Sequence, residues 1–230
     1  MLTCEGLVLR QGDFSLEADV LFPDGKITAL IGPSGAGKST LLAAIAGFLQ
    51  PADGKVRWQG QDLTMAAPGA RTISMLFQDN NLFPHLTAAQ NVGLGLRPNL
   101  KLSDAEETAV IAALANVGLD GFGTRKPSAL SGGQQSRVAL ARLLVSDRAV
   151  VLLDEPFAAL GPALKDEMLD LVKSKLGAAG KTVVMVTHDP SDARRIADFA
   201  VLVADGLVTT PVQTDVLLDN PPPALAAYLG

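Results

Sequence analysis

A glycine-rich stretch followed by a lysine and two hydroxyl side chains is the first feature of this chain that could do chemistry. Backbone N–H groups that bend around glycines can point at phosphate oxygens, and a helix starting here adds its positive dipole end. Lys38 can reach the outer phosphates, and the Ser39 hydroxyl suits Mg²⁺. A glycine turn without ligand would not need this lysine–serine pair. The stretch predicts a phosphate-binding loop made of Gly32, Pro33, Ser34, Gly35, Ala36, Gly37, Lys38, Ser39 and Thr40.

An acidic pair is the second such feature. Asp154 and Glu155 follow the four apolar residues of 150–153, so a strand should deliver both carboxylates to its C-terminal end. Ligands bind there in open α/β sheets. Asp154 could orient Mg²⁺, and Glu155 could polarise an attacking water as a general base. Such a pair can also cap the next helix, but after a phosphate-binding loop we favour the metal-binding interpretation.

His188 and Gln78 also stand at the ends of apolar runs. His188 comes after 183–186, and Gln78 ends the run 73–77. A neutral imidazole there could contact the γ-phosphate and hold the attacking water in line with Glu155. An amide could touch both Mg²⁺ and that water. A single histidine is more often structural and a single glutamine is uninformative, so the prediction for His188 depends on its ending a strand of the same parallel sheet.

Two glycines between a serine and a glutamine mark a second anion site. A helix that begins at such residues attracts anions to its N-terminus. The chain already has one phosphate site, so a second γ-phosphate binder is most useful if it completes the site of another copy. We therefore predict a nucleotide contact from Ser131, Gly132, Gly133 and Gln134.

The elements that must position these residues indicate an α/β fold. The apolar run 27–31 predicts a strand leading into the phosphate-binding loop, and 38–48 predicts a helix leaving it. Buried-strand runs at 150–153 and 182–186 flank a helix of about 163–179. This alternation is typical of βαβ units and a parallel sheet.

Residues 87–147 differ in character and predict an inserted helical segment. Thr87 with Gln90, and Ser103 with Glu106, fit the capping box that opens a helix.

The two ends of the chain give weaker signals. The apolar residues of 2–31 predict strands, with a tight turn at 24–25 between two of them. Asp189 can cap a helix that has Pro190 at its first position. The tail 219–230 predicts irregular chain with one last helical turn.

Composition narrows the class of protein. Hydrophobic residues make up 48% and charged residues 19%, which is typical of a globular chain. The net charge of −5 argues against a nucleic-acid partner, because phosphate binding favours an excess of Lys and Arg. Cys4 is the only cysteine, so no internal disulfide is possible. Without a signal peptide or a long apolar run, we expect a soluble chain in the cytoplasm.

Residues 130–137, Leu-Ser-Gly-Gly-Gln-Gln-Ser-Arg, resemble the signature of ATP-binding cassette (ABC) proteins, which other phosphate-loop NTPases lack. The resemblance covers essentially the whole chain and implies the ATPase subunit of a membrane transporter, with ATP and Mg²⁺ as its ligands. It implies an α/β, P-loop NTPase (RecA-like) core with an antiparallel β-subdomain over 1–86 and 148–218. A helical signature subdomain would cover 87–147, followed by the tail 219–230, all in one nucleotide-binding domain over 1–230.

The resemblance assigns roles to the residues above. Catalysis would involve Glu155, His188, Gln78 and Lys38, and the metal would be held by Ser39, Gln78 and Asp154.

Partners are implied in the same way. Two copies would pack head to tail as a homodimer around two ATP molecules. The dimer would bind an integral-membrane permease at the cytoplasmic face of the inner membrane, and a periplasmic substrate-binding protein indirectly. Leu82 and Phe83 would line a groove that grips a short helix of the permease, or they could anchor their loop in its own core.

A longer pattern over 74–87, 91–96 and 100–102 resembles the ATP-binding subunits of bacterial thiamine and thiamine pyrophosphate importers. Ferric iron, polyamine and oxyanion importers share much of it and stay open as alternatives. A non-transport ABC ATPase usually carries coiled coils, tandem cassettes or basic extensions that this chain does not show. A phosphate-loop kinase would leave 131–134 and His188 unused.

Two positions depart from the family pattern. Gly161 stands where the family usually has an aspartate that links the two ATP sites, so we expect looser coupling between them. The family also stacks an aromatic ring on adenine from the first strand turn, where this chain has Arg10 and, further on, Phe14. A guanidinium plane or a ring could take that role.

Overall fold

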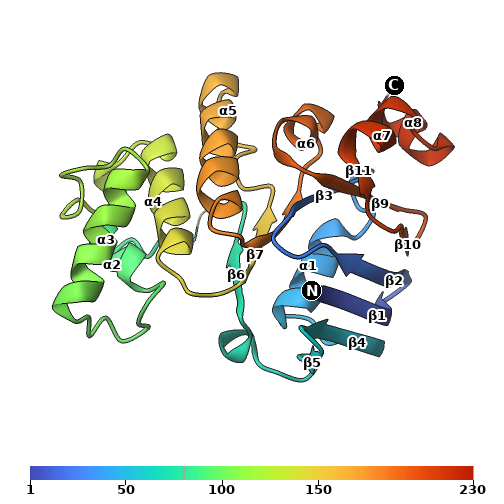
Figure 1. Ribbon diagram of the computed structural model, residues 1–230, viewed down its shortest axis with the longest axis horizontal. Coiled ribbons are helices and arrows are strands. Elements are labelled where there is room, and N and C mark those ends of the chain that lie inside the picture. Colours follow the sequence, from blue (N-terminus) through green and yellow to red (C-terminus); the bar gives the residue numbers. More distant parts are fainter. Residues whose placement is uncertain (80, 230) are drawn as a thin grey trace.

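A large mixed sheet organises the molecule (Figure 1). The computed structural model describes residues 1–79 and 81–229, without the side chain of Leu229, and in this part the sheet has eleven strands. Their order is β5-β4-β1-β2-β10-β9-β3-β8-β7-β6, with β11 paired to β9. The strands are β1 Leu2–Gln11, β2 Phe14–Phe22, β3 Ile27–Ile31, β4 Asp53–Trp58, β5 Gln61–Asp62, β6 Ile73–Leu76, β7 Val150–Asp154, β8 Thr182–Val186, β9 Phe199–Ala204, β10 Leu207–Val208 and β11 Val212–Gln213.

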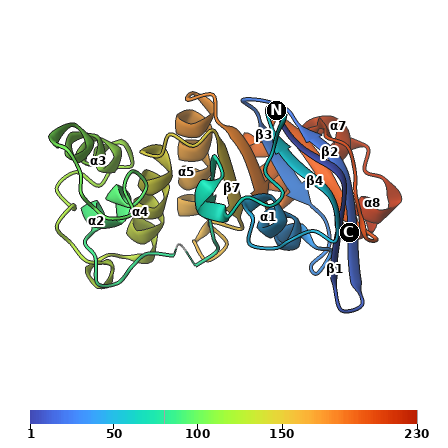
Figure 2. The same ribbon diagram turned by 90° about the horizontal axis from the view of Figure 1, so that it is seen from below.

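Helices fill both sides of this sheet and one end of the molecule (Figures 1 and 2). They are α1 Lys38–Ala46, α2 Ala88–Gly93, α3 Asp104–Asn116, α4 Gly132–Leu144, α5 Pro162–Leu171, α6 Pro190–Ile196, α7 Thr214–Asp219 and α8 Pro223–Leu229, with short 3₁₀ turns at Pro68–Ala70 and Pro127–Ala129. No helix in the described ranges is long and apolar enough to cross a membrane.

The parallel part of the sheet is made by β6, β7, β8, β3 and β9, and it confirms the sequence-based prediction. All five residues of β3 and of β8 are buried because helices cover both faces. Side chains alternate between the two faces along β7. Val150 and Leu152 join the apolar cluster that contains α1, whereas Val151 and Leu153 join the cluster that contains α5.

The antiparallel part is made by β1, β2, β4 and β5. The turn at Asp24 and Gly25 is present, and Gly25 has a φ of +65°. The strands that it joins do not pair, however, because β10 and β9 lie between β2 and β3. Turn residues predict that the chain reverses its direction, but they do not predict which strands pair in the sheet.

Helices α2, α3 and α4 lie together at one end of the molecule in both views, opposite α7 and α8 (Figures 1 and 2). Both predicted capping boxes are confirmed. Thr87 and Gln90 exchange hydrogen bonds at the start of α2, and Ser103 and Glu106 do so at the start of α3. These contacts depend on four consecutive residues only, which is why the sequence predicts them well.

Helix α1 ends earlier than predicted, at Ala46. Gly47 follows with a φ of +90°, a left-handed conformation that ends helices and favours glycine. The guanidinium of Arg71 meets this end of the helix and donates to the carbonyl oxygens of Ala44 and Ile45, at 2.9 and 2.7 Å. It also donates to the carbonyls of Ala66 and Thr64. The side chain is 2% exposed, so it joins α1 to the loop before β6 inside the protein.

Replacing Arg71 by methionine should therefore destabilise the fold. A hydrogen bond from a charged donor contributes about 1.5–3 kcal/mol, and unpaired buried carbonyls carry a further cost, so we expect the free energy of unfolding to fall by about 3 kcal/mol or more. Urea unfolding followed by circular dichroism measures this change. Arg97→Met is the matched control, because Arg97 forms an exposed ion pair with Glu106 and should change the free energy by less than about 1 kcal/mol. Equal effects of the two substitutions would contradict the structural role of Arg71.

The Cys4 thiol lies in the core of the antiparallel part and is 1% exposed. Burial, with a smaller effect of Asp19, raises its pKa to about 12. Because only the thiolate is a good nucleophile, a thiol reagent should not react with native protein at pH 8 and should react fully after unfolding in urea. Absorbance of the released chromophore measures this, and rapid reaction of the native protein would contradict the prediction.

Two further boundaries differ from the predicted ones. The helix expected over 163–179 is α-helical only to Leu171 and continues as a π-helix over Val172–Gly177. The tail forms helix α8, which is longer than the single turn expected. Proline is well tolerated at the start of a helix, and Leu225 anchors α8 by inserting, fully buried, among the apolar side chains of α7 and β9.

Candidate functional site

The predicted phosphate-binding loop connects β3 to α1, as its sequence pattern requires. Gly32 and Gly37 have φ values of +144° and +100°, which favour glycine. A Cβ atom at Gly32 would lie 2.1 Å from the carbonyl oxygen of Val203, and one at Gly37 would lie 2.5 Å from the ring of Phe14. Gly37 caps α1 without a side-chain hydrogen bond. The N–H groups of the first helical turn are therefore available to an anion.

The Lys38 side chain folds back over this loop. Its Nζ donates to the carbonyl oxygens of Gly32 and Pro33 at 2.7 and 2.8 Å. Burial lowers the pKa of Lys38, while the carboxylates of Glu155 and Asp154 act in the opposite direction. The ammonium is thus held by the loop, within electrostatic reach of the acidic pair.

Ser39 and Asp154 meet although 115 residues separate them. The Ser39 hydroxyl donates to Asp154 Oδ1 at 2.8 Å. Burial raises the pKa of Asp154, and the hydrogen bond from Ser39 opposes this shift. Mg²⁺ prefers hard oxygen ligands and is usually held by one or two carboxylates together with substrate phosphates. A hydroxyl and a carboxylate side by side next to a phosphate-binding loop fit that ion.

Gln78 lies in the turn after β6, and its side chain is exposed. Leu76 pairs with Leu153 in the parallel sheet, so the chain brings Gln78 to the same edge as Asp154. In the described ranges no hydrogen bond joins Gln78 to Ser39 or Asp154.

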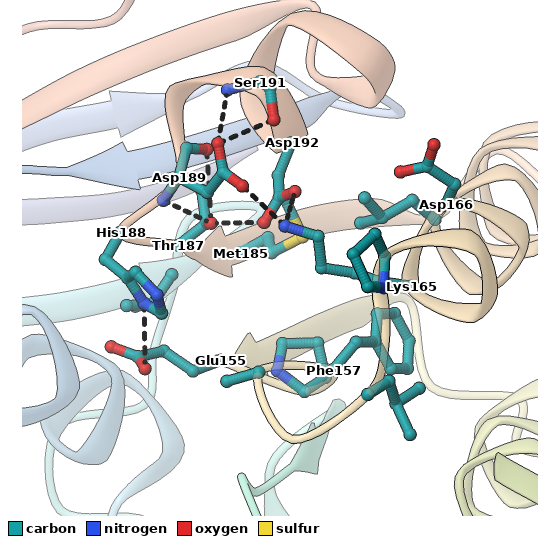
Figure 3. A pocket seen from close by; sticks show the side chains of 16 residues that line it. Glu155, Phe157, Lys165, Asp166, Met185, Thr187, His188, Asp189, Ser191 and Asp192 are labelled. Atoms are coloured by element: carbon teal, nitrogen blue, oxygen red, sulfur yellow. Dashed lines mark hydrogen bonds and ion pairs between the residues drawn. The ribbon is translucent and has the colours of Figure 1, made fainter.

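Glu155 and His188 follow the neighbouring strands β7 and β8, whose register pairs Asp154 with Val186 (Figure 3). Glu155 Oε2 lies 3.2 Å from His188 Nδ1. Glu155 has a φ of +45°, an uncommon backbone conformation for a residue other than glycine. Its N–H group bonds the carbonyl oxygen of Val186. His188 follows shortly after the end of β8, at Val186, in the same parallel sheet as Asp154, so the condition for its prediction is met.

Residues Ser131–Gln134 lie away from this cluster. They open α4 with a third capping box, in which the Ser131 hydroxyl accepts from the Gln134 N–H and the Gln134 side chain accepts from the Ser131 N–H. Gly132 is exposed, and a Cβ atom there would meet nothing within 4 Å. Gly133 is buried against Leu164. Both views show α5 and strand β7 between α4 and α1 (Figures 1 and 2).

Comparison with known proteins agrees with this geometry. Residues 17–158 match the family described as ABC transporter. The chain belongs to this family. The similar ABC proteins include "Thiamine import ATP-binding protein ThiQ" of Cereibacter sphaeroides, at 57% identity, and the protein of the same name from Ruegeria sp. (strain TM1040), at 59%; both alignments cover 100% of each chain. The fold resembles the dimeric bacterial ABC transporter cassette MJ0796, with a TM-score of 0.80, 29% identity and coverage of 93% of this chain and 99% of that one. The cassette was also solved as a dimer bound to ADP and Pi.

These findings confirm the predicted P-loop NTPase fold and the assignment to the ATPase subunits of ABC transporters. Gly161, where the resemblance implies an aspartate in the family, caps α5 with a φ of −66°. A Cβ atom at Gly161 would meet nothing within 4 Å. The backbone therefore does not require glycine, and an aspartate would fit.

Phe14 and Arg10 differ in their surroundings. The Phe14 ring lies against Gly37 of the phosphate-binding loop and is half-buried, whereas Arg10 is exposed on β1. Stacking on adenine by either side chain stays a prediction.

The sequence did not predict a polar cluster beside His188 (Figure 3). Lys165 of α5 forms ion pairs with Asp189 at 2.6 Å and with Asp192 at 2.7 Å. Asp192 also accepts a hydrogen bond of 2.7 Å from Thr187. Hydrogen bonds from Lys165 and, to a smaller extent, from Ser191 lower the pKa of Asp189 to about 2. The only signal in the sequence is the cap motif at Asp189, because the partner lysine comes from another helix.

Proposed function

We propose that this chain is the ATP-binding and ATP-hydrolysing subunit of an importer for thiamine or thiamine pyrophosphate. The observation that carries the proposal is the identity of 57% and 59%, over the whole chain, with proteins named for thiamine import. The residues of the nucleotide site do not discriminate between cargoes, so the proposed cargo depends on this similarity and on the sequence pattern in 74–87, 91–96 and 100–102.

The proposed site binds the ATP phosphates in the loop 32–40. Lys38 would turn from the loop carbonyls to the β- and γ-phosphates, where its charge is compensated. Ser39 and Asp154 would hold Mg²⁺, with Gln78 completing the set from the neighbouring strand end. Bound there, Mg²⁺ supplies positive charge that stabilises the phosphates during transfer.

Glu155 is the proposed general base. Its carboxylate accepts a proton from the attacking water, and His188 keeps the carboxylate in place through the contact at 3.2 Å. Phosphoryl transfer depends mainly on positioning and charge. Alignment of the base with the attacking water therefore raises the rate of hydrolysis more than an unaligned base would.

The proposed active form is a head-to-tail homodimer. Ser131–Gln134 open α4, with Ser131 and Gly132 exposed, and α5 and β7 lie between α4 and the helix α1 that follows the phosphate-binding loop (Figures 1 and 2). A second copy could bring this N-terminus onto the γ-phosphate. The dimeric cassettes that the fold resembles support such an arrangement.

A partly apolar groove supports the proposal of a permease partner. It lies between the end of α1, β6 and α4, and its lining combines Phe48, Phe77 and Leu94 with Arg142 and Arg148. Among the described residues, neither Leu82 nor Phe83 lines this groove, contrary to the expectation from the sequence. Phe48 is 59% exposed, although large apolar side chains are usually buried. Leu82 packs on the protein's own core, whereas the Phe83 ring is 47% exposed. A short amphipathic helix of the permease, at the cytoplasmic face of the inner membrane, fits this surface.

Growth on limiting thiamine tests the proposed cargo. Deletion of the gene should abolish growth at low external thiamine in a strain that cannot make thiamine, and the wild-type gene should restore it. A gene carrying Glu155→Gln should not restore it, and excess thiamine should rescue every strain. Normal growth of the deletion strain, with uptake of labelled thiamine unchanged, would refute this cargo and leave the ATPase assignment intact.

A further inference from the structure

The last helix of the chain reaches the loop that carries His188. The hydroxyl of Tyr228, on α8, donates a hydrogen bond to the backbone carbonyl oxygen of His188. The two residues are 40 positions apart, and nothing in the proposed chemistry uses this contact.

Helix α8 is fixed well enough to hold that hydroxyl in place. Leu225 is fully buried in an apolar cluster with Leu217 and Leu218 of α7, Ile31 of β3 and Leu202 of β9. The Tyr228 ring packs on the same apolar cluster. Burial and the nearby carboxylates of Glu155 and Asp189 raise the pKa of Tyr228, which keeps the phenol protonated as a donor.

The residues on both sides of His188 are held from another direction (Figure 3). Thr187 bonds Asp192, and Asp189 bonds Lys165 and caps α6 through the Ser191 N–H. The Asp189 N–H also donates to Thr187 Oγ1 at 3.1 Å, so the cluster holds the N–H side of the peptide that joins His188 to Asp189. The carbonyl of His188 itself is held by Tyr228. The imidazole of His188 is exposed, so few contacts of its own fix it. Rotation of the peptide that follows His188 would therefore move the imidazole relative to Glu155.

We propose that Tyr228 is a positioning residue for His188, so that the C-terminal helix sets the alignment of the imidazole with Glu155. This inference rests on the proposed role of His188 in ATP hydrolysis. Helix α8 would then take part in catalysis although it carries none of the phosphate-binding or signature residues.

The test is Tyr228→Phe, which removes the hydroxyl and keeps the ring. We expect kcat for ATP hydrolysis to fall about 3- to 10-fold, as for one lost hydrogen bond, with an unchanged ATP concentration for half-maximal rate and an unchanged melting temperature. Ala227→Ser, at the exposed neighbouring position, is the matched control and should behave as the wild type.

Nuclear magnetic resonance gives a readout that does not depend on activity. The chain has two histidines, so the Cε1–H signal of His188 is assigned by comparison with a His85→Asn variant. Tyr228→Phe should shift the His188 signal and leave that of His85 in place. An unchanged kcat, an unchanged His188 signal, or a lower kcat accompanied by a lower melting temperature would overturn the proposal. A wild-type protein that does not hydrolyse ATP would instead refute the proposed function, while the shift of the His188 signal would still report the contact.

Discussion

Replacing Glu155 by glutamine should lower kcat for ATP hydrolysis by about 10²- to 10⁴-fold, the range that general-base catalysis contributes. Glutamine has nearly the same size and can keep a contact with His188, but its amide cannot accept a proton from water. ATP binding should persist because the phosphate-binding loop, Lys38 and Asp154 are unchanged. Phosphate release measures kcat, and equilibrium binding of labelled ATP measures affinity.

Glu107→Gln is the control for this substitution. Glu107 is an exposed glutamate on α3, so removing its charge should leave both values unchanged. A Glu155→Gln protein with kcat within about tenfold of the wild type would exclude Glu155 as the base, since general-base catalysis contributes more than that.

Replacing Lys38 by alanine should abolish tight ATP binding. The substitution removes the ammonium that donates to the loop carbonyls of Gly32 and Pro33 and that would turn to the phosphates of ATP. Losing one partner of a buried, charge-assisted contact costs about 2–5 kcal/mol, and each 1.4 kcal/mol is tenfold in affinity. We therefore expect the Kd for ATP to rise by about 30-fold or more. Isothermal titration calorimetry measures this change.

Lys26→Ala is the matched control for Lys38→Ala. Lys26 forms an exposed ion pair with Asp198 away from the site, so its loss should leave ATP affinity unchanged. Circular dichroism verifies that both proteins are folded. Retained tight binding by Lys38→Ala would refute the assigned role of this lysine.

Local motifs were predictable from the sequence because their physical cause lies within a few residues. The glycines of the phosphate-binding loop, the capping boxes at Thr87 and Ser103, and the apolar runs of the parallel strands belong to this class. The positions of Asp154 and His188 also followed, since parallel strands bring their C-terminal ends to one edge.

Contacts between distant elements were not predictable. Arg71 looks like a surface residue in the sequence, and only the fold shows that it meets the end of α1. The Lys165 cluster and the Tyr228 hydroxyl depend on how helices pack, which no local pattern encodes. The length of α8 was misjudged for the same reason, because Leu225 stabilises it through a cluster formed by other segments.

Light scattering is the decisive measurement for the proposed cross-chain ATP site. The Glu155→Gln protein should have the mass of one chain, 23.8 kDa, without nucleotide and twice that mass in saturating Mg-ATP. Adding Ser131→Arg should keep it at the mass of one chain, because the larger side chain blocks the partner's γ-phosphate position. A mass of one chain for Glu155→Gln in saturating Mg-ATP would show that ATP does not join two copies and would refute the cross-chain site.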